Sequence, residues 1–243
     1  LMAGYLQKKG IELVKGVTVP LWVPANSEFV IEGFVNTECG IIGWEPGDEP
    51  IGEGAVFEGP FGDHTGYYSM PDRYPVLDVT AVTHRNNAVF PATVVGPPPQ
   101  EDYYLGKATE RIMLPLLKVI VPDIIDYHLP RFGAFHNCAF VKIKSEYTEH
   151  ARKVMHAIWG AGQMAWTKLI VVVGEDVDVH DEHVVLQAVS GIDIHNDIEL
   201  TRGPLDILDH AASELGAGGK MGIDATNTSR NENGIAIIGV DKQ

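Results

Sequence analysis

Three consecutive prolines, at positions 97–99, divide the chain into two parts with different hydrophobic patterns. Proline lacks a backbone N–H and fixes its own φ, so neither a central strand nor a helix interior tolerates this triplet. Before the prolines, short runs of β-branched and aromatic residues alternate with turn residues. After them, longer segments with helical periodicity alternate with apolar runs. The sequence therefore predicts a strand-rich first part and a second part that mixes helices and strands.

The first part, residues 1–100, contains short candidate strands that are separated by Gly, Pro and polar turn residues. The candidates span residues 11–14, 17–19, 29–31, 76–82 and 88–95. Turns recur at intervals of roughly eight to twelve residues, which is typical of a barrel or sandwich. Residues 36–55 are rich in Gly, Pro and acidic residues and are expected to form an exposed loop.

The second part begins with a predicted helix over 102–119, in which Pro115 is expected to introduce a kink. We therefore assign residues 101–122 to a linker helix. Strands are predicted at 138–143 and 169–173, and helices at 147–166 and 181–188. This alternating order indicates a small α/β domain over residues 123–243.

Bulk composition narrows the classes of function. The formal net charge is −15 at pH 7, and a field of that sign repels phosphate backbones, so we do not expect a nucleic-acid partner. Cys39 and Cys138 do not form a CxxC pair, which favours reduced thiols. Because no apolar run approaches a membrane span and no signal-peptide pattern opens the chain, we expect no integral membrane segment and a cytoplasmic location.

The segment Glu58–Tyr68 reads EGPFGDHTGYY and carries the richest chemistry in the chain. It places Glu58 and Asp63 five residues apart across a Gly-Pro-x-Gly turn, followed directly by His64. Glycine and proline together leave such a turn few conformations. From the residues alone two interpretations stay open. The carboxylates are either catalytic groups whose pKa values differ, or caps for backbone amides on a solvated turn.

This segment resembles the signature of the UbiD family of decarboxylases, which use prenylated FMN to remove carboxylate from aromatic or α,β-unsaturated acids. Further segments resemble the family in the same order along the chain, so that the resemblance covers nearly all of it. They are residues 23–33, 82–88, 167–173, 203–206 and 218–226. One departure is the run 189–197, where the family usually carries Asp-Pro-x-Arg-Asp and this chain has no arginine.

The resemblance implies a fold of the α+β or α/β class. Residues 1–100 would be the C-terminal part of a β-rich, split-barrel domain that binds prenylated FMN, and residues 123–243 an oligomerisation domain. Family members are roughly twice as long as this chain, which resembles their second half. We therefore expect the N-terminal half to be missing and this chain alone to be inactive and to bind no cofactor.

The resemblance also implies residue roles. Glu58 resembles the first acid of the family, which hydrogen-bonds an arginine near the flavin, and Asp63 resembles the acid that protonates the carbon after CO₂ leaves. His64 would orient that acid or the substrate, and Leu205 resembles the apolar lid position. The arginine and the metal ligands belong to the missing half, so we assign no metal ligand and no cofactor-binding residue here.

Cofactors and partners follow from the same resemblance. They are prenylated FMN, a divalent metal (Mn or Mg) and potassium in the full-length protein, with a flavin prenyltransferase as supplier of the cofactor. The substrate would be a small aromatic acid, a hydroxybenzoate- or hydroxynaphthoate-type precursor of ubiquinone or menaquinone. The assembly would be a homodimer or homohexamer.

Other interpretations remain. The chain could be a non-catalytic assembly subunit that keeps the fold. His180 and His183 are spaced so that one helical turn could present both to a metal ion, although a solvated helix N-terminus is the interpretation we prefer. We expect Glu28 and Glu32 to be structural and Lys220 to form a surface ion pair.

Overall fold

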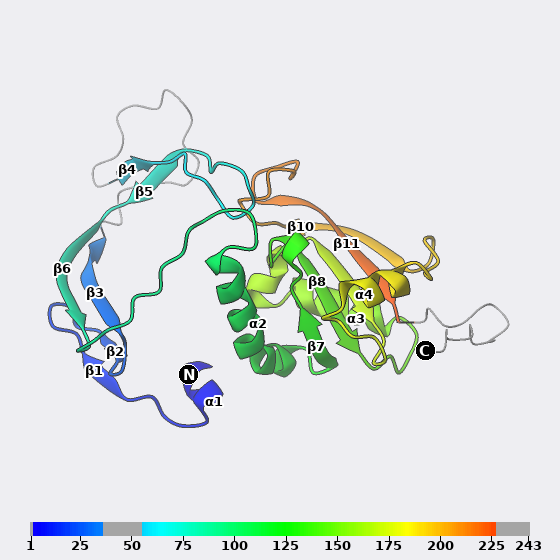
Figure 1. Cartoon of the computed structure of the whole chain (residues 1–243), viewed down its shortest axis with the longest axis horizontal. Helices are drawn as coiled ribbons and strands as arrows, with labels where there is room; N and C mark the ends of the chain where they lie inside the picture. Colours follow the sequence, from blue (N-terminus) through cyan, green and yellow to red (C-terminus); the bar gives the residue numbers. More distant parts are fainter. Residues whose placement is uncertain (1, 36–54, 227–243) are drawn as a thin grey trace. The chain divides into compact units, whose positions relative to one another are not determined.

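The computed structural model describes residues 2–35 and 55–226. The chain consists of two compact units, which span Leu1–Gly96 and Pro97–Gln243. The boundary between them falls at the start of the proline triplet. Figure 1 shows the N-terminal unit in blue to cyan and the C-terminal unit in green to orange. Helices and strands are both well represented, which makes the fold α+β.

The N-terminal unit consists of antiparallel strand pairs. Strand β1 (Leu13–Lys15) pairs with β2 (Trp22–Pro24), β3 (Phe29–Val35) with β6 (Leu77–His84), and β4 (Ala55–Glu58) with β5 (Asp72–Pro75). A short helix, α1 (Met2–Gln7), precedes them. Each described sheet in this unit therefore has two strands.

Two predicted strands of this unit are wrong. Residues 17–19 form a turn region rather than a strand, because their backbone N–H groups donate to the carboxylate of Glu32. Residues 88–95 contain no strand either. Here Val89 donates its backbone N–H to Glu28 at 3.0 Å, and Pro91 has no N–H to donate to a sheet.

Glu32 lies on β3 and is 4% exposed. Its carboxylate accepts hydrogen bonds from the backbone N–H groups of Val17, Thr18 and Val19 at 2.9, 2.7 and 3.1 Å. These bonds, from Val17 first, lower the pKa of Glu32 from 4.5 to about 2. Its role as a structural carboxylate is thus confirmed.

Acidification is expected to weaken the N-terminal unit through Glu32. Since its folded pKa is lower than its unfolded pKa, its stabilising contribution is complete above about pH 4.5 and is lost as the pH falls toward 2. Hydrogen-exchange protection of β3 and β6 should therefore fall over this pH range in the wild type and change less in Glu32→Gln. Glu12→Gln alters an exposed carboxylate and should follow the wild type. If the protection of β3 and β6 falls with pH to the same extent in wild type and Glu32→Gln, Glu32 does not have this role.

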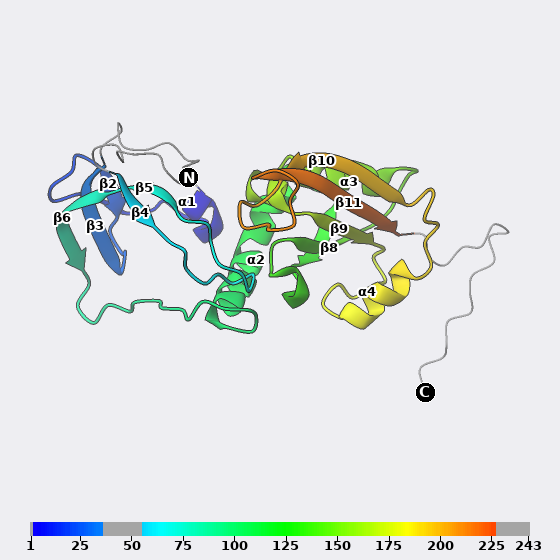
Figure 2. The same ribbon diagram turned by 90° about the horizontal axis from the view of Figure 1, so that it is seen from above.

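A five-stranded mixed sheet forms the centre of the C-terminal unit, in the order β10-β11-β9-β8-β7, and Figure 2 labels the first four of these strands. Its strands are β7 (Ile124–His128), β8 (Cys138–Ile143), β9 (Leu169–Val173), β10 (Ile198–Pro204) and β11 (Ala217–Ala225). The inner pairs β8–β9 and β9–β11 are parallel, and both edge strands are antiparallel to their neighbours. The strands predicted at 138–143 and 169–173 are confirmed.

Side chains alternate between the two faces of this sheet. Ile170 and Val172 of β9 pack in a core cluster with α2 (Glu101–Ile120) and α3 (His150–Trp159), whereas Val171 and Val173 pack in a second cluster with α4 (Glu182–Val189). Because β9 is covered on both faces, an uninterrupted apolar run suits it.

The predicted helices are confirmed with different limits. Helix α2 extends one residue beyond the prediction at each end and continues through Pro115. Helix α4 begins after Asp181, whose side chain accepts from two backbone N–H groups as an N-cap. The helix predicted over 147–166 is wrong at both ends, because α3 begins at His150 and ends at Trp159, and a separate 3₁₀ helix, η2 (Gly162–Trp166), begins at Gly162, whose φ is positive. No helix within residues 2–35 and 55–226 is long and apolar enough to span a membrane.

Lys220 does not form the surface ion pair expected for it. The side chain lies on β11, is 4% exposed, and donates to the backbone carbonyls of Ala165 and Thr167. Removal from water lowers its pKa to about 8. Lys220 therefore ties β11 to the end of η2 through main-chain acceptors, which are 55 and 53 residues away along the chain.

Candidate active site

The motif segment Glu58–Tyr68 begins at the end of β4 and forms most of the connection to β5. Glu58 is the last residue of β4 and pairs in register with Asp72 of β5. Gly59 follows with φ +97°, a conformation that L side chains rarely adopt. A Cβ atom at Gly59 would also lie 3.3 Å from the carbonyl oxygen of Met70. The backbone conformation at the end of β4 thus requires a glycine at position 59.

A compact turn then folds the segment back on itself. Asp63 donates its backbone N–H to the Tyr67 carbonyl at 3.0 Å, and Gly66 donates to the Asp63 carbonyl at 3.0 Å. Ser69 closes the turn, since its backbone N–H donates to the Phe61 carbonyl at 2.9 Å and its hydroxyl accepts from the Phe61 N–H at 3.1 Å. The structure therefore places the turn at residues 63–67, directly after the Gly-Pro-x-Gly residues from which a turn was predicted.

The two motif acids lie in different environments. Asp63 is 5% exposed, and Glu58 is exposed at the end of β4. Asp63 Oδ2 accepts from the Thr65 hydroxyl at 2.7 Å, and Asp63 Oδ1 lies 2.7 Å from His64 Nδ1. The carboxylate of Asp63 is therefore buried within an otherwise largely exposed turn and has two side-chain partners, while Glu58 is exposed at the strand end.

The contact between Asp63 and His64 requires a proton. A carboxylate oxygen and an imidazole nitrogen at 2.7 Å form a hydrogen bond only if one of them carries the hydrogen. If Asp63 is ionised, His64 Nδ1 donates; if Asp63 is protonated, it donates to His64. Since the His64 side chain is 18% exposed, it connects the buried carboxyl to the surface of the unit. The pair is arranged to hold and transfer one proton.

Leu205 lies in the C-terminal unit, directly after β10. It is 3% exposed and packs against Gly218, where a Cβ atom would lie only 2.7 Å from Leu205 Cδ1. Its backbone N–H donates to the Gly216 carbonyl at 2.9 Å. Lys168 pairs with Asp209 of the same loop at 2.7 Å. Its role as a lid over a substrate stays a prediction.

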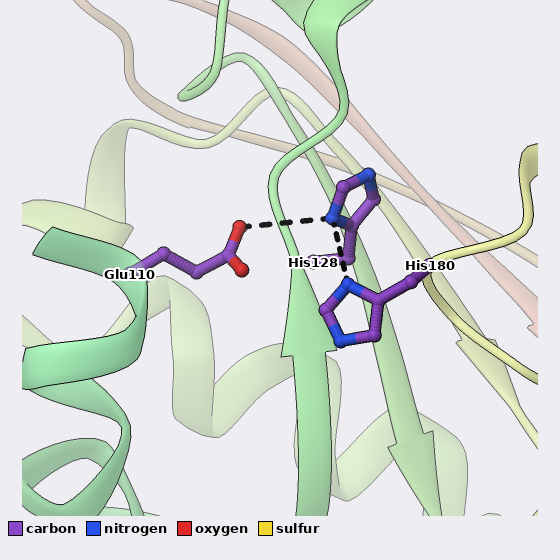
Figure 3. Close-up of side chains that lie close together, drawn as sticks. All are labelled: Glu110, His128 and His180. Carbon is purple, nitrogen blue, oxygen red and sulfur yellow. Dashed lines mark hydrogen bonds and ion pairs between the residues drawn. The ribbon is translucent and has the colours of Figure 1, made fainter. Parts of the chain in front are cut away.

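A second group of side chains was not found from the sequence. Glu110, His128 and His180 each offer a ligand atom, and these atoms lie within 4.8 Å of one another (Figure 3). His180 thus meets His128 of β7 and Glu110 of α2, whereas the sequence had suggested His183 as its companion. No local spacing could reveal this group, because its members come from a helix, a strand and a loop.

Two family models match the chain. The Rift-related domain of 3-octaprenyl-4-hydroxybenzoate carboxy-lyase matches residues 1–98, and the C-terminal domain of the same enzyme matches residues 103–225. An uncharacterised protein of Aquifex aeolicus is 48% identical over 233 residues, which are 96% of this chain and 45% of that protein. An uncharacterised protein of Archaeoglobus fulgidus is 48% identical over 96% of this chain and 46% of its own length. The chain spans about half the length of these relatives.

Solved structures also match nearly the whole of this chain with about half of their own length. The UbiD-class enzyme HmfF from Pelotomaculum thermopropionicum, in complex with FMN, is 28% identical with a TM-score of 0.64, over 96% of this chain and 46% of that one. The closed form of Sedimentibacter hydroxybenzoicus vanillic acid decarboxylase shares the fold, with a TM-score of 0.74 at 24% identity over 95% of this chain and 46% of that one.

Proposed function

The chain belongs to the UbiD family of carboxy-lyases, and on that premise we propose that it forms part of a reversible, non-oxidative decarboxylase of aromatic or α,β-unsaturated acids. The observation that carries the proposal is Asp63, a buried carboxyl in the family motif, hydrogen-bonded to His64 and Thr65. A buried acid that has a proton-exchanging neighbour suits proton delivery to carbon.

The proposed cofactor is prenylated FMN, which supplies the electron sink that decarboxylation requires and that side chains lack. Glu58, Asp63 and Asp72 all lie on β4, β5 or the segment between them, and carboxylates repel phosphate, so these residues do not suit the phosphate end of such a cofactor. We therefore derive no flavin contact from this chain. Contacts to the phosphate, a divalent metal (Mn or Mg) and potassium would come from the N-terminal half that family members carry.

In this mechanism Asp63 holds the proton that replaces the departing CO₂. Asp63 is buried, and the hydroxyl of Thr65 fixes the orientation of its Oδ2. After Asp63 gives its proton to carbon, His64 Nδ1 is 2.7 Å away and can return one from the surface. Glu58, exposed at the end of β4, is available to hydrogen-bond the arginine that the family places near the flavin.

The N-terminal unit supports the proposal that further protein completes the enzyme. Isolated two-stranded sheets are marginally stable in water, and each described sheet of this unit has two strands. The β3–β6 pair also carries large apolar side chains that are 44–58% exposed, at Ile31, Phe34, Val35, Leu77, Val79 and Val82. These side chains suit burial against the N-terminal half that family members carry. We call the chain together with that half the assembled enzyme.

The substrate, the cofactor supplier, the location and the assembly are proposed from membership of the UbiD family. We propose a quinone precursor of the hydroxybenzoate or hydroxynaphthoate type as the substrate, a flavin prenyltransferase as cofactor supplier, and a cytoplasmic homo-oligomer. The description of the matching models, a 3-octaprenyl-4-hydroxybenzoate carboxy-lyase, supports this substrate class. A non-catalytic assembly subunit is disfavoured because such a protein has no need of a buried, hydrogen-bonded Asp63.

The test is CO₂ release by the assembled enzyme, reconstituted with prenylated FMN, on a panel of hydroxybenzoates, hydroxynaphthoates and cinnamates. We expect release from at least one hydroxy-aromatic acid, and none when unmodified FMN replaces the prenylated form. A protein that retains prenylated FMN but releases no CO₂ from any acid would favour the assembly-subunit alternative.

A further inference from the structure

The group formed by Glu110, His128 and His180, here called the histidine cluster, has the spacing of metal ligands. His128 Nδ1 lies 3.2 Å from His180 Nδ1 and 3.8 Å from Glu110 Oε2. Ligand atoms about 2.0–2.1 Å from a tetrahedral metal ion are roughly 3.3–3.4 Å apart, so the separation of the two imidazole nitrogens already matches. Figure 3 shows the three side chains converging from α2, the end of β7 and the loop before α4.

Two imidazole nitrogens of the cluster face each other, His128 Nδ1 and His180 Nδ1, and each presents a lone pair when both rings are neutral. His180 Nε2 lies 3.0 Å from Asp126 Oδ2, a contact that in a neutral ring places the hydrogen on Nε2 and leaves a lone pair on Nδ1. His128 Nδ1 lies 2.6 Å from Lys107 Nζ, whose ammonium can only donate, so this nitrogen also presents a lone pair. Two lone pairs at 3.2 Å repel each other unless a cation lies against both.

A cation is already present beside the cluster in the form of the Lys107 ammonium. Lys107 Nζ lies 2.5 Å from Glu110 Oε2 as well as 2.6 Å from His128 Nδ1. Its side chain is 23% exposed and can therefore swing into solvent. Glu110 would keep its other partners, because Arg111 pairs with Oε1 at 2.8 Å and the Leu129 N–H donates to Oε2.

We propose that the histidine cluster is a binding site for a divalent transition metal ion, Zn²⁺ foremost, which displaces the Lys107 ammonium. Two imidazoles and a carboxylate are a donor set that suits Zn²⁺ and Co²⁺ better than Mg²⁺ or Ca²⁺. Asp126 supplies the carboxylate that commonly orients a metal-binding histidine through its second nitrogen. His180 is 40% exposed, so the ion can reach the site from solvent. The site is independent of the proposed decarboxylase function.

The test is titration of the chelator-treated chain with Co²⁺, because tetrahedral Co²⁺ absorbs strongly in the visible range and aqueous Co²⁺ does not. We expect a saturable band that Zn²⁺ abolishes by competition. His180→Ala should remove the band, and Asp126→Asn should weaken Co²⁺ binding by roughly 10–100-fold. His183→Ala is the matched control, since this exposed histidine lies on the same segment but outside the cluster.

Lys107→Met separates metal binding from a merely structural ion pair. Removal of the competing positive charge should strengthen Co²⁺ binding by about tenfold or more. The variant should also melt below the wild type without metal and recover on addition of Zn²⁺, whereas Lys107→Met with His180→Ala should not recover. A wild-type chain without a saturable band overturns the proposal, as does a band that His183→Ala weakens as much as His180→Ala does.

Discussion

Asp63→Asn is expected to lower decarboxylation by the assembled enzyme by about a hundred- to ten-thousand-fold, the range in which a positioned general acid contributes. Asparagine keeps the size of the side chain and can still accept from the Thr65 hydroxyl, but it has no proton to give to carbon. The variant should therefore bind cofactor and substrate and fail at proton transfer.

Proton transfer can be measured apart from CO₂ loss. In D₂O without CO₂, the assembled enzyme should exchange the hydrogen at the vacated carbon of the product, and Asp63→Asn should not. Asp78→Asn, which changes an exposed carboxylate on β6, is the control and should retain both activities. If Asp63→Asn exchanges this hydrogen at the wild-type rate, Asp63 is not the acid.

The chain without the N-terminal half of the family is expected to release no CO₂ and to lose prenylated FMN on gel filtration. One physical reason is the excess of carboxylates on β4, β5 and the segment between them, which disfavours the flavin phosphate. The other is the set of exposed apolar side chains on β3 and β6. Together these leave the cofactor without an anchor and the two-stranded sheets without cover.

The comparison is between this chain alone and the same chain with the N-terminal half, joined or added as a second polypeptide. Cofactor retention is followed by its absorbance and activity by CO₂ release. Only the assembled enzyme should show both. If the chain alone releases CO₂ at a rate within tenfold of that of the assembled enzyme, the N-terminal half is not required for activity and the proposal is wrong.

The sequence alone predicted the strands that their own hydrophobic pattern specifies, and it failed where strand formation depends on a partner elsewhere in the chain. Strands β8 and β9 were predicted at their observed limits, and β9 is an uninterrupted apolar run of the kind that buried parallel strands show. Residues 88–95 have strand-forming composition, but a strand also needs a partner, and the N–H of Val89 donates to Glu28 instead. A sequence pattern does not specify such a competing acceptor, which lies 61 residues away.

The candidate site residues show the same difference between local sequence patterns and contacts of residues that are far apart in the chain. Glu58, Asp63 and His64 lie in one contiguous motif, so the turn that holds them was predictable, whereas the burial of Asp63 emerged only from the folded turn. The environment of Lys220 and the histidine cluster depend on contacts across more than 50 residues of sequence. No spacing or periodicity encodes these contacts, which explains why Lys220 was wrongly assigned to the surface.

Isotope exchange between ¹³C-bicarbonate and the carboxylate of the acid tests the central claim most directly, because it requires the carbon–carbon bond to break and re-form at the same site. The assembled enzyme with prenylated FMN should introduce ¹³C into the recovered hydroxy-aromatic acid, and Asp63→Asn should not. Absence of label in every acid of the panel, from protein that holds the cofactor, would contradict the assignment of this chain to a decarboxylase.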